Sequence, residues 1–226
     1  MPEERLVIVI PGSGGPDANT RRIVDALDRA YGSRATRTVE VDWRTWKGNE
    51  VQAPFAARRL GARLGGQLRA SARQPRALHL VGVSVGAHVA DALAEAYAAA
   101  SPSSRAHVRL TLLDPFTARG AIGVAVPRAS LGVRSFGKHA DYCEAVVNTD
   151  DPVPATNEPL SRALNYDVTA AASRSSFDPL PGDSLHSWPA AWFGANARTL
   201  LGDAKGALPR HPPSGDGARG TVRVVG

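Results

Sequence analysis

Residues 78–89 read LHLVGVSVGAHV, an apolar run that ends at a Gly-x-Ser-x-Gly pattern and continues into a segment rich in Ala and Val. The run predicts a buried strand, and the segment after it predicts a helix. A serine on a sharp strand-to-helix turn is held in a strained backbone conformation, and the positions beside it must be small because strand, turn and helix crowd together. Gly82 and Gly86 meet this requirement around Ser84, which is therefore predicted to be a nucleophile. The alternative is a glycine-rich helix start in which Ser84 is only the cap.

Strand-like and helix-like segments alternate on both sides of this turn. The expected strands cover residues 5–10, 38–43, 77–83, 107–113, 142–147 and 165–169. The expected helices begin near Asp17, Pro54, Val85 and Pro189. This alternation predicts an α/β fold with a mostly parallel sheet of about six strands, covered by helices on both faces.

The length and composition fit one domain. A chain of 226 residues with 43% hydrophobic content can bury one good core, and a single α/β domain is expected over residues 1–202. Residues 203–226 are mostly Gly, Pro and charged, and we expect them to form a mobile tail. Residues 115–141 are the longest stretch without a clear element inside the domain and could form a small cap over a site.

The charge and the single cysteine exclude several classes. The formal charge of +6 comes from basic residues scattered along the chain, which favours a solvated surface over a nucleic-acid footprint. Cys143 is alone, so no intrachain disulfide can form. The apolar run near the N-terminus is short and lacks a basic region before it, and no apolar stretch reaches the length of a membrane span. The expectation is a soluble cytoplasmic protein with no stable membrane insertion and no nucleic-acid partner.

A nucleophilic serine needs a histidine base, which in this kind of fold follows it in the chain after an acid. The histidines after Ser84 are His88, His107, His139, His186 and His211. His88 is on the helix after the turn, where packing is its expected role. His107 begins a strand, at the wrong edge of the sheet for the expected site. His211 is in the tail. His186, in a loop after the last expected strand, is the favoured base, and His139 is the alternative.

The acid has several candidates. Asp114 ends one strand in the sequence LLDP, and Asp150 and Asp151 end the next strand in NTDDPVP. In a parallel sheet these positions share one edge, from which a carboxylate could reach an imidazole. Spacing alone does not choose between them.

Two backbone N–H groups are expected to stabilise an oxyanion. One is that of Val85, the residue after the serine, and the other belongs to the loop PGSGG at residues 11–15, with Ser13 as the expected donor. The same loop could be taken for a dinucleotide-binding fingerprint. However, Asp17 occupies the third glycine position of that fingerprint, and no P-loop lysine follows.

Three stretches carry a resemblance to a known superfamily. VEVDWRTW at 39–46, GVSVGAHVAD at 82–91 and LTLLDPF at 110–116 resemble the α/β-hydrolase superfamily, and more narrowly its pancreatic-lipase-type branch. The resemblance covers roughly residues 5–200. In that branch the acid follows the strand after the nucleophile helix, so the resemblance implies Asp114, whereas the usual superfamily position implies Asp150 or Asp151. HSWPAAWF is similar to the histidine loop of bacterial lipase-like hydrolases, which implies His186.

The sequence also departs from the secreted lipases of that branch. Their disulfides, signal peptide, large lid and second lipid-binding domain are not seen, and Pro11-Gly12 replaces the usual His-Gly before the oxyanion loop. The resemblance therefore implies a serine hydrolase that cleaves a small-molecule carboxylic ester or thioester through an acyl-enzyme, without metal or cofactor, rather than a lipase acting on emulsified fat.

Three further expectations follow from the same residues. An acyltransferase or cyclase of a biosynthetic pathway would use the same triad, and a non-catalytic binding member of the fold is the other alternative.

The four tryptophans, Trp43, Trp46, Trp188 and Trp192, lie near sheet-edge loops and are expected to pack in the core or to line a close acyl pocket. If they line a pocket, short to medium soluble substrates are preferred to long-chain triglyceride.

Overall fold

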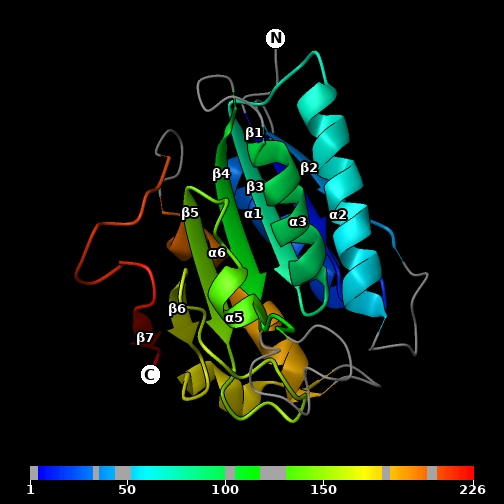
Figure 1. Cartoon of the computed structure of the whole chain (residues 1–226). Helices are drawn as coiled ribbons and strands as arrows, with labels where there is room; N and C mark the ends of the chain where they lie inside the picture. The colour runs from blue at the N-terminus through cyan, green and yellow to red at the C-terminus, as the bar shows by residue number, and fades with distance from the viewer. Residues whose placement is uncertain are drawn as a thin grey trace.

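The centre of the protein is a parallel sheet (Figure 1). The computed structural model describes residues 5–32, 36–43, 52–99, 105–117, 131–179, 184–202 and 208–226. The seven strands lie in the order β2-β1-β3-β4-β5-β6-β7, and every neighbouring pair is parallel. Their bounds are β1 Arg5–Ile10, β2 Thr36–Glu40, β3 Ala77–Val83, β4 His107–Leu113, β5 Tyr142–Val147, β6 Leu164–Asp167 and β7 Val222–Val224. The expected α/β-hydrolase fold class is confirmed.

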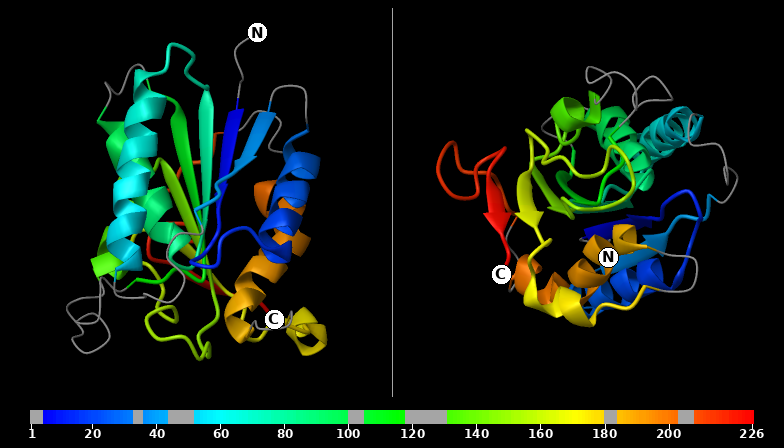
Figure 2. Two further views of the ribbon diagram at one scale, coloured as in Figure 1. Left: turned by 90° about the vertical axis from the view of Figure 1, so that its right-hand side faces the viewer. Right: turned by 90° about the horizontal axis from the view of Figure 1, so that it is seen from below.

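Two helices cover each face of the sheet. α1 (Ala18–Tyr31) and α6 (Trp188–Leu201) lie on one face, and α2 (Ala53–Ala70) and α3 (Gly86–Ala98) lie on the other (Figure 2, left). Each pair encloses its own apolar cluster: Leu80, Leu110 and Leu112 face α3, whereas Val81 and Leu113 face α1 and α6. The alternation of side chains along each strand thus fills two cores, as the sequence pattern predicts.

The helix starts follow the local sequence. Asp17 caps α1 by accepting the Thr20 N–H at 2.7 Å, and the Thr20 hydroxyl oxygen accepts the Asp17 N–H at 2.9 Å, which completes a capping box. Proline stands in the first turn of both α2 and α6, where its missing N–H has no cost. The expected strand at 38–43 is shifted, because β2 begins at Thr36 and ends at Glu40.

The expectation of a mobile tail is wrong for residues 208–226. β7 pairs with β6, and the Pro209 carbonyl oxygen accepts a hydrogen bond from His107 Nε2 at 2.7 Å. The Arg219 guanidinium donates to the carbonyl oxygens of Gly137 and Ala140. These bonds satisfy backbone groups at the start of β5 and along the edge of β6, which outweighs the high Gly and Pro content of the segment. Residues 203–207 are outside the described residues.

The stretch expected to form a cap, residues 115–141, is described only in part. Residues 118–130 lie outside the described residues, and the remainder contains the short helix α5 (Leu131–Ser135) followed by the fully buried Phe136. Among the residues that the structure describes, no helix combines the length and the apolar character needed to cross a bilayer.

The parallel arrangement brings three strand ends to one edge. Val83 of β3 is level with Leu113 of β4, which in turn is level with Val146 of β5. The residues that follow these strands therefore meet at the carboxyl edge of the sheet, where ligands usually bind in α/β folds.

Candidate active site

Ser84 lies on a strained turn between β3 and α3. Its backbone φ is +52°, a left-handed conformation that costs a non-glycine residue about 1–3 kcal/mol. A Cβ on Gly82 would lie 2.9 Å from Ala87 Cα, and one on Gly86 would lie 2.5 Å from the carbonyl oxygens of Ile10 and Pro11. Both glycines are thus required by the close approach of strand, turn and helix.

Backbone hydrogen bonds fix this turn to the neighbouring strand. The Ser84 N–H donates to the Leu113 carbonyl oxygen at 2.9 Å, and the Ser84 carbonyl oxygen accepts from the N–H groups of Ala87 and Phe116. Asp114, the next residue after β4, also has a positive φ, of +45°, and its N–H donates to Val146. The serine turn and the Asp114 turn are therefore parts of one bonded structure.

The loop after β1 lies beside Ser84. A Cβ on Gly12 would lie 3.5 Å from Ser84 Cβ, and the Gly15 N–H closes a turn onto the Gly12 carbonyl oxygen at 3.1 Å. The indole N–H of Trp43 donates to the Pro11 carbonyl oxygen at 2.9 Å and holds the start of the loop. Within the described residues, neither the Ser13 N–H nor the Val85 N–H donates to a protein acceptor.

His186 is presented by a short 3₁₀ turn, Leu185–Ser187, that precedes α6. The Ser184 side chain accepts the His186 N–H at 3.2 Å and caps this turn. The Nδ1 atom of His186 lies 2.8 Å from Asp114 Oδ2 and 2.6 Å from Asp151 Oδ2. The structure thus brings His186 together with two of the three carboxylates that the sequence left open.

Asp114 is 1% exposed, and few hydrogen bonds compensate for its burial. Its Oδ1 atom accepts the Asn148 N–H at 3.1 Å. Burial raises the pKa of Asp114 to about 8, and the neighbouring Asp151 adds to the rise, whereas His186 opposes it.

Asp151 has a richer set of donors. Its Oδ1 atom accepts the Val153 N–H at 2.9 Å, and its Oδ2 atom accepts the Thr156 hydroxyl at 2.7 Å in addition to the His186 ring. Burial acts to raise the pKa of Asp151, but these bonds together with one to Asp114 hold it well below its usual range.

The ring of His186 responds to both carboxylates. Burial alone would lower its pKa, but the hydrogen bonds and charges of Asp114 and Asp151 raise the pKa of His186 to about 9. Among the described side chains, no hydrogen bond joins the Ser84 hydroxyl to His186. Contacts of this kind are commonly long before substrate binds and tighten in the complex.

The remaining candidates lie elsewhere. Asp150 points outward and pairs with Arg174 at 2.6 Å. His139 precedes Asp141, whose N–H bonds to Val108 near the start of β4, so His139 lies toward the opposite edge of the sheet. His88 is buried between the rings of Phe116 and Phe136, which is the packing role expected for it.

One cluster also has the composition of a cation site. Asp114, Asp151 and His186 each offer a ligand atom within 4.8 Å of the other two, and no other such group of three occurs among the described residues. Both carboxylates, however, approach the same ring nitrogen, and hydrogen bonds from Val153 and Thr156 already occupy Asp151. The donor pattern fits a hydrogen-bonded cluster of side chains better than a metal site.

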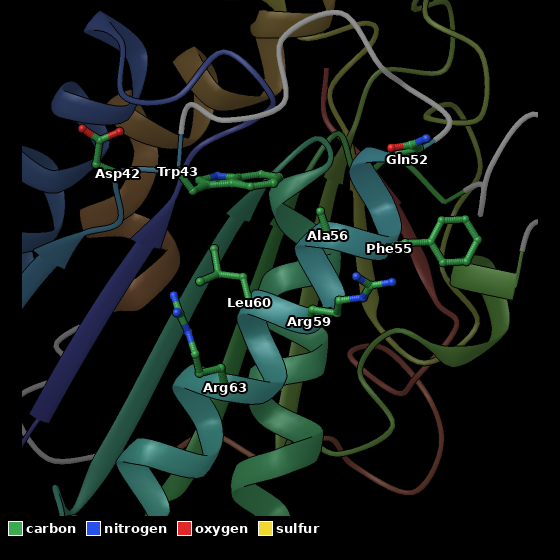
Figure 3. Close-up of a pocket in the computed structure, with 8 residues that line it drawn as sticks. All are labelled: Asp42, Trp43, Gln52, Phe55, Ala56, Arg59, Leu60 and Arg63. Atoms are coloured by element: carbon green, nitrogen blue, oxygen red, sulfur yellow. The ribbon is translucent and has the colours of Figure 1, made fainter.

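A groove of about 680 Å³ lies between α2 and the segment after β2 (Figure 3). Its lining residues are Asp42, Trp43, Gln52, Phe55, Ala56, Arg59, Leu60 and Arg63. Figure 3 shows Leu60 extending from α2 toward Trp43, with Arg63 one turn further along the helix. Trp43 links this groove to the loop beside Ser84 through its bond to Pro11.

The other two tryptophans that the structure describes do not line this groove. Trp188 and Trp192 are buried in the cluster between the sheet and α1 and α6, and the Trp188 indole donates to the Val168 carbonyl oxygen at 2.9 Å. Trp46 is outside the described residues. Of the three tryptophans that the structure describes, Trp43 is thus the one placed to act as a pocket wall.

Comparison with known proteins supports the fold. No protein-family model and no curated protein matches the chain. Among solved structures, a putative carboxylesterase from Lactobacillus plantarum is similar, with a TM-score of 0.53 and 18% identity over 92% of this chain and 88% of the other. At this identity the likeness establishes the α/β-hydrolase fold and leaves the lipase-type branch without support.

Proposed function

We propose that the protein is a serine hydrolase that cleaves a small-molecule carboxylic ester or thioester through an acyl-enzyme on Ser84. The observation that carries the proposal is the position of Ser84 at φ +52° on a strand-to-helix turn, at the sheet edge where His186 contacts two carboxylates. A solved structure of similar fold is described as a putative carboxylesterase, which favours the same chemistry.

The base follows from the hydrogen bonds of His186. Its Nδ1 atom is held by Asp114 and Asp151 and must carry a proton to donate to them. The neutral ring therefore presents an unprotonated Nε2, the form required to take the Ser84 proton. As Ser84 Oγ bonds to the acyl carbon, that proton moves to Nε2, and the two carboxyl groups stabilise the imidazolium that forms.

The negative charge on the acyl oxygen needs donors that are in place before the reaction. The N–H groups of Ser13 and Val85 have no acceptor among the described residues, and Val85 immediately precedes the N-terminus of the 13-residue helix α3. We expect both groups to hold the oxyanion, with the helix dipole adding to the effect. The imidazolium then protonates the leaving alcohol or thiol, and water releases the acid by the same histidine acting as base.

The proposal is tested with p-nitrophenyl esters of short acids. Ser84→Ala should lower kcat by about 10³-fold or more while circular dichroism and thermal unfolding stay like those of the wild type. Ser176→Ala, which changes an exposed serine that bonds only to the Ser173 carbonyl oxygen, is the matched control and should leave the rate unchanged. Equal turnover in Ser84→Ala and the control would reject the proposal.

A further inference from the structure

Two carboxyl groups from different strand ends approach one nitrogen of His186. Asp114 follows β4 and Asp151 follows β5, and their Oδ2 atoms lie 2.8 Å and 2.6 Å from Nδ1. Their side chains are 1% and 0% exposed. A serine triad needs a single acid at this position, so the second carboxyl group requires an explanation.

A protonated His186 ring balances the charge of one carboxylate, so a second ionised carboxyl group at the same nitrogen would leave a net buried negative charge. Two buried like charges in contact with the same atom repel strongly, and one of them is expected to keep its proton. Arg174 is engaged with Asp150 on the exposed side. Besides burial, the groups that act on the pKa of Asp114 are His186 and Asp151 themselves.

The hydrogen-bond donors distinguish the two groups. Asp151 accepts from the Val153 N–H and from the Thr156 hydroxyl, besides the His186 ring. Apart from His186, the Asn148 N–H is the one donor to Asp114 among the residues that the structure describes. Because donors favour the ionised form of a carboxyl group, the charge belongs on Asp151 and the proton on Asp114.

We propose that the acid of this site is a carboxyl–carboxylate pair that holds one proton, in which Asp151 is the ionised member that accepts from His186 Nδ1 and Asp114 is its protonated partner. This assignment differs from the resemblance to lipases, which implies Asp114 alone. Below about pH 8, where Asp114 holds its proton, the pair keeps that proton during acyl transfer: the Ser84 proton moves to Nε2 and leaves with the alcohol, and the single negative charge balances the imidazolium. The catalytic part of the proposal rests on the proposed hydrolase function, whereas the shared proton does not.

The pair makes a specific prediction for variants. In Asp114→Asn the amide N–H₂ group can replace the O–H that protonated Asp114 donates to Asp151, so Asp151 still accepts from His186. In Asp151→Asn the repulsion is removed, and Asp114 is expected to ionise and act as the acceptor. Each single variant should therefore retain at least about tenfold more kcat than the double variant, which should lose about 10³- to 10⁴-fold.

A readout independent of turnover tests the shared proton. Infrared difference spectra at pH 6.5 of protein with isotope-labelled aspartate should show a buried protonated carboxyl band in the wild type that is absent in both Asp114→Asn and Asp151→Asn. Asp141→Asn is the matched control, because Asp141 is paired with Arg105 at 3.0 Å and should not affect the band. Thermal unfolding verifies that each variant is folded.

The outcomes separate this proposal from the proposed function. A wild-type spectrum without the band, or a single variant as inactive as the double variant, would overturn the pair. A protein that shows the band but turns over no ester and does not react at Ser84 would retain the pair and reject the hydrolase.

Discussion

The Ser84 N–H donates to the Leu113 carbonyl oxygen at 2.9 Å, so the turn that carries the serine is bonded directly to the end of the strand that precedes Asp114. The position of Ser84, the proposed nucleophile, and that of the Asp114 carboxyl group are therefore not independent. A change that displaces the turn is expected to disturb both the fold at this edge and the chemistry there.

Gly86→Ala should test this coupling. The added Cβ would lie 2.5 Å from the carbonyl oxygens of Ile10 and Pro11, so β1 and the loop beside Ser84 must move. We expect a loss of about 1–3 kcal/mol in the free energy of unfolding, measured by urea denaturation, together with a loss of esterase activity.

The control for this variant is Gly66→Ala. Gly66 lies within α2, and a Cβ there meets nothing within 4 Å, so alanine should stabilise the helix by about 0.5–1 kcal/mol and leave activity intact. Equal stabilities of the two variants would contradict the packing argument.

The pH dependence of the rate should reflect His186. Its pKa is raised to about 9 by the two carboxyl groups, and the base must be neutral to accept the Ser84 proton. For a substrate that does not titrate, kcat/KM should therefore rise as pH increases from 6.5 toward 9. A rate that is level across this range would show that the ring is not held as described.

Asp114 should make stability depend on pH in the opposite direction to an ordinary acid. Its pKa is raised from 3.8 to about 8, so between these values the folded state holds a proton that the unfolded chain releases. The free energy of unfolding should consequently fall as pH rises from about 4 to 8, and the raised pKa of His186 extends the fall toward pH 9.

Asp114→Asn isolates the contribution of this carboxyl group. Urea denaturation at pH 5 and pH 8 should show a smaller loss of stability in the variant than in the wild type. An identical loss in both proteins would mean that Asp114 is ionised in the folded state at pH 5.

The groove beside Trp43 should bind part of the substrate. Leu60→Trp would fill it where Leu60 extends toward Trp43, and should raise KM more for p-nitrophenyl hexanoate than for the acetate (Figure 3). Ala62→Trp places the same ring on the exposed side of α2 and serves as the control.

We also expect activity to peak at short to medium acyl chains without a jump at the solubility limit, and a maximum on palmitate at an emulsion surface would contradict this.

Much of the scaffold could be predicted from local pattern. The strands at 107–113 and 142–147 have the expected bounds, because buried parallel strands give continuous apolar runs closed by turn residues. The Gly-x-Ser-x-Gly turn was identifiable for a steric reason that the structure retains at Gly82 and Gly86. β7 was missed because a three-residue edge strand within a Gly- and Pro-rich segment has too little pattern to be distinguished from a tail.

The acid could not be resolved from spacing, for a physical reason. Asp114 and Asp151 follow adjacent parallel strands whose ends are level, so both lie within reach of one histidine, and the sequence offered them as alternatives. Asn148 is a site residue that the sequence analysis does not predict: its N–H donates to Asp114 and its side-chain amide donates to the Leu185 carbonyl oxygen. The one sequence feature that points to Asn148 is its position directly after β5.

The central claim is that Ser84 is an activated nucleophile, and covalent labelling tests it most directly. Wild-type protein treated with a serine-directed fluorophosphonate should gain the mass of a single adduct, which peptide mapping places on Ser84, and prior incubation with a slow ester substrate should protect it. Ser84→Ala should gain none. A wild-type protein that remains unlabelled, or an adduct that persists in Ser84→Ala, would contradict the account.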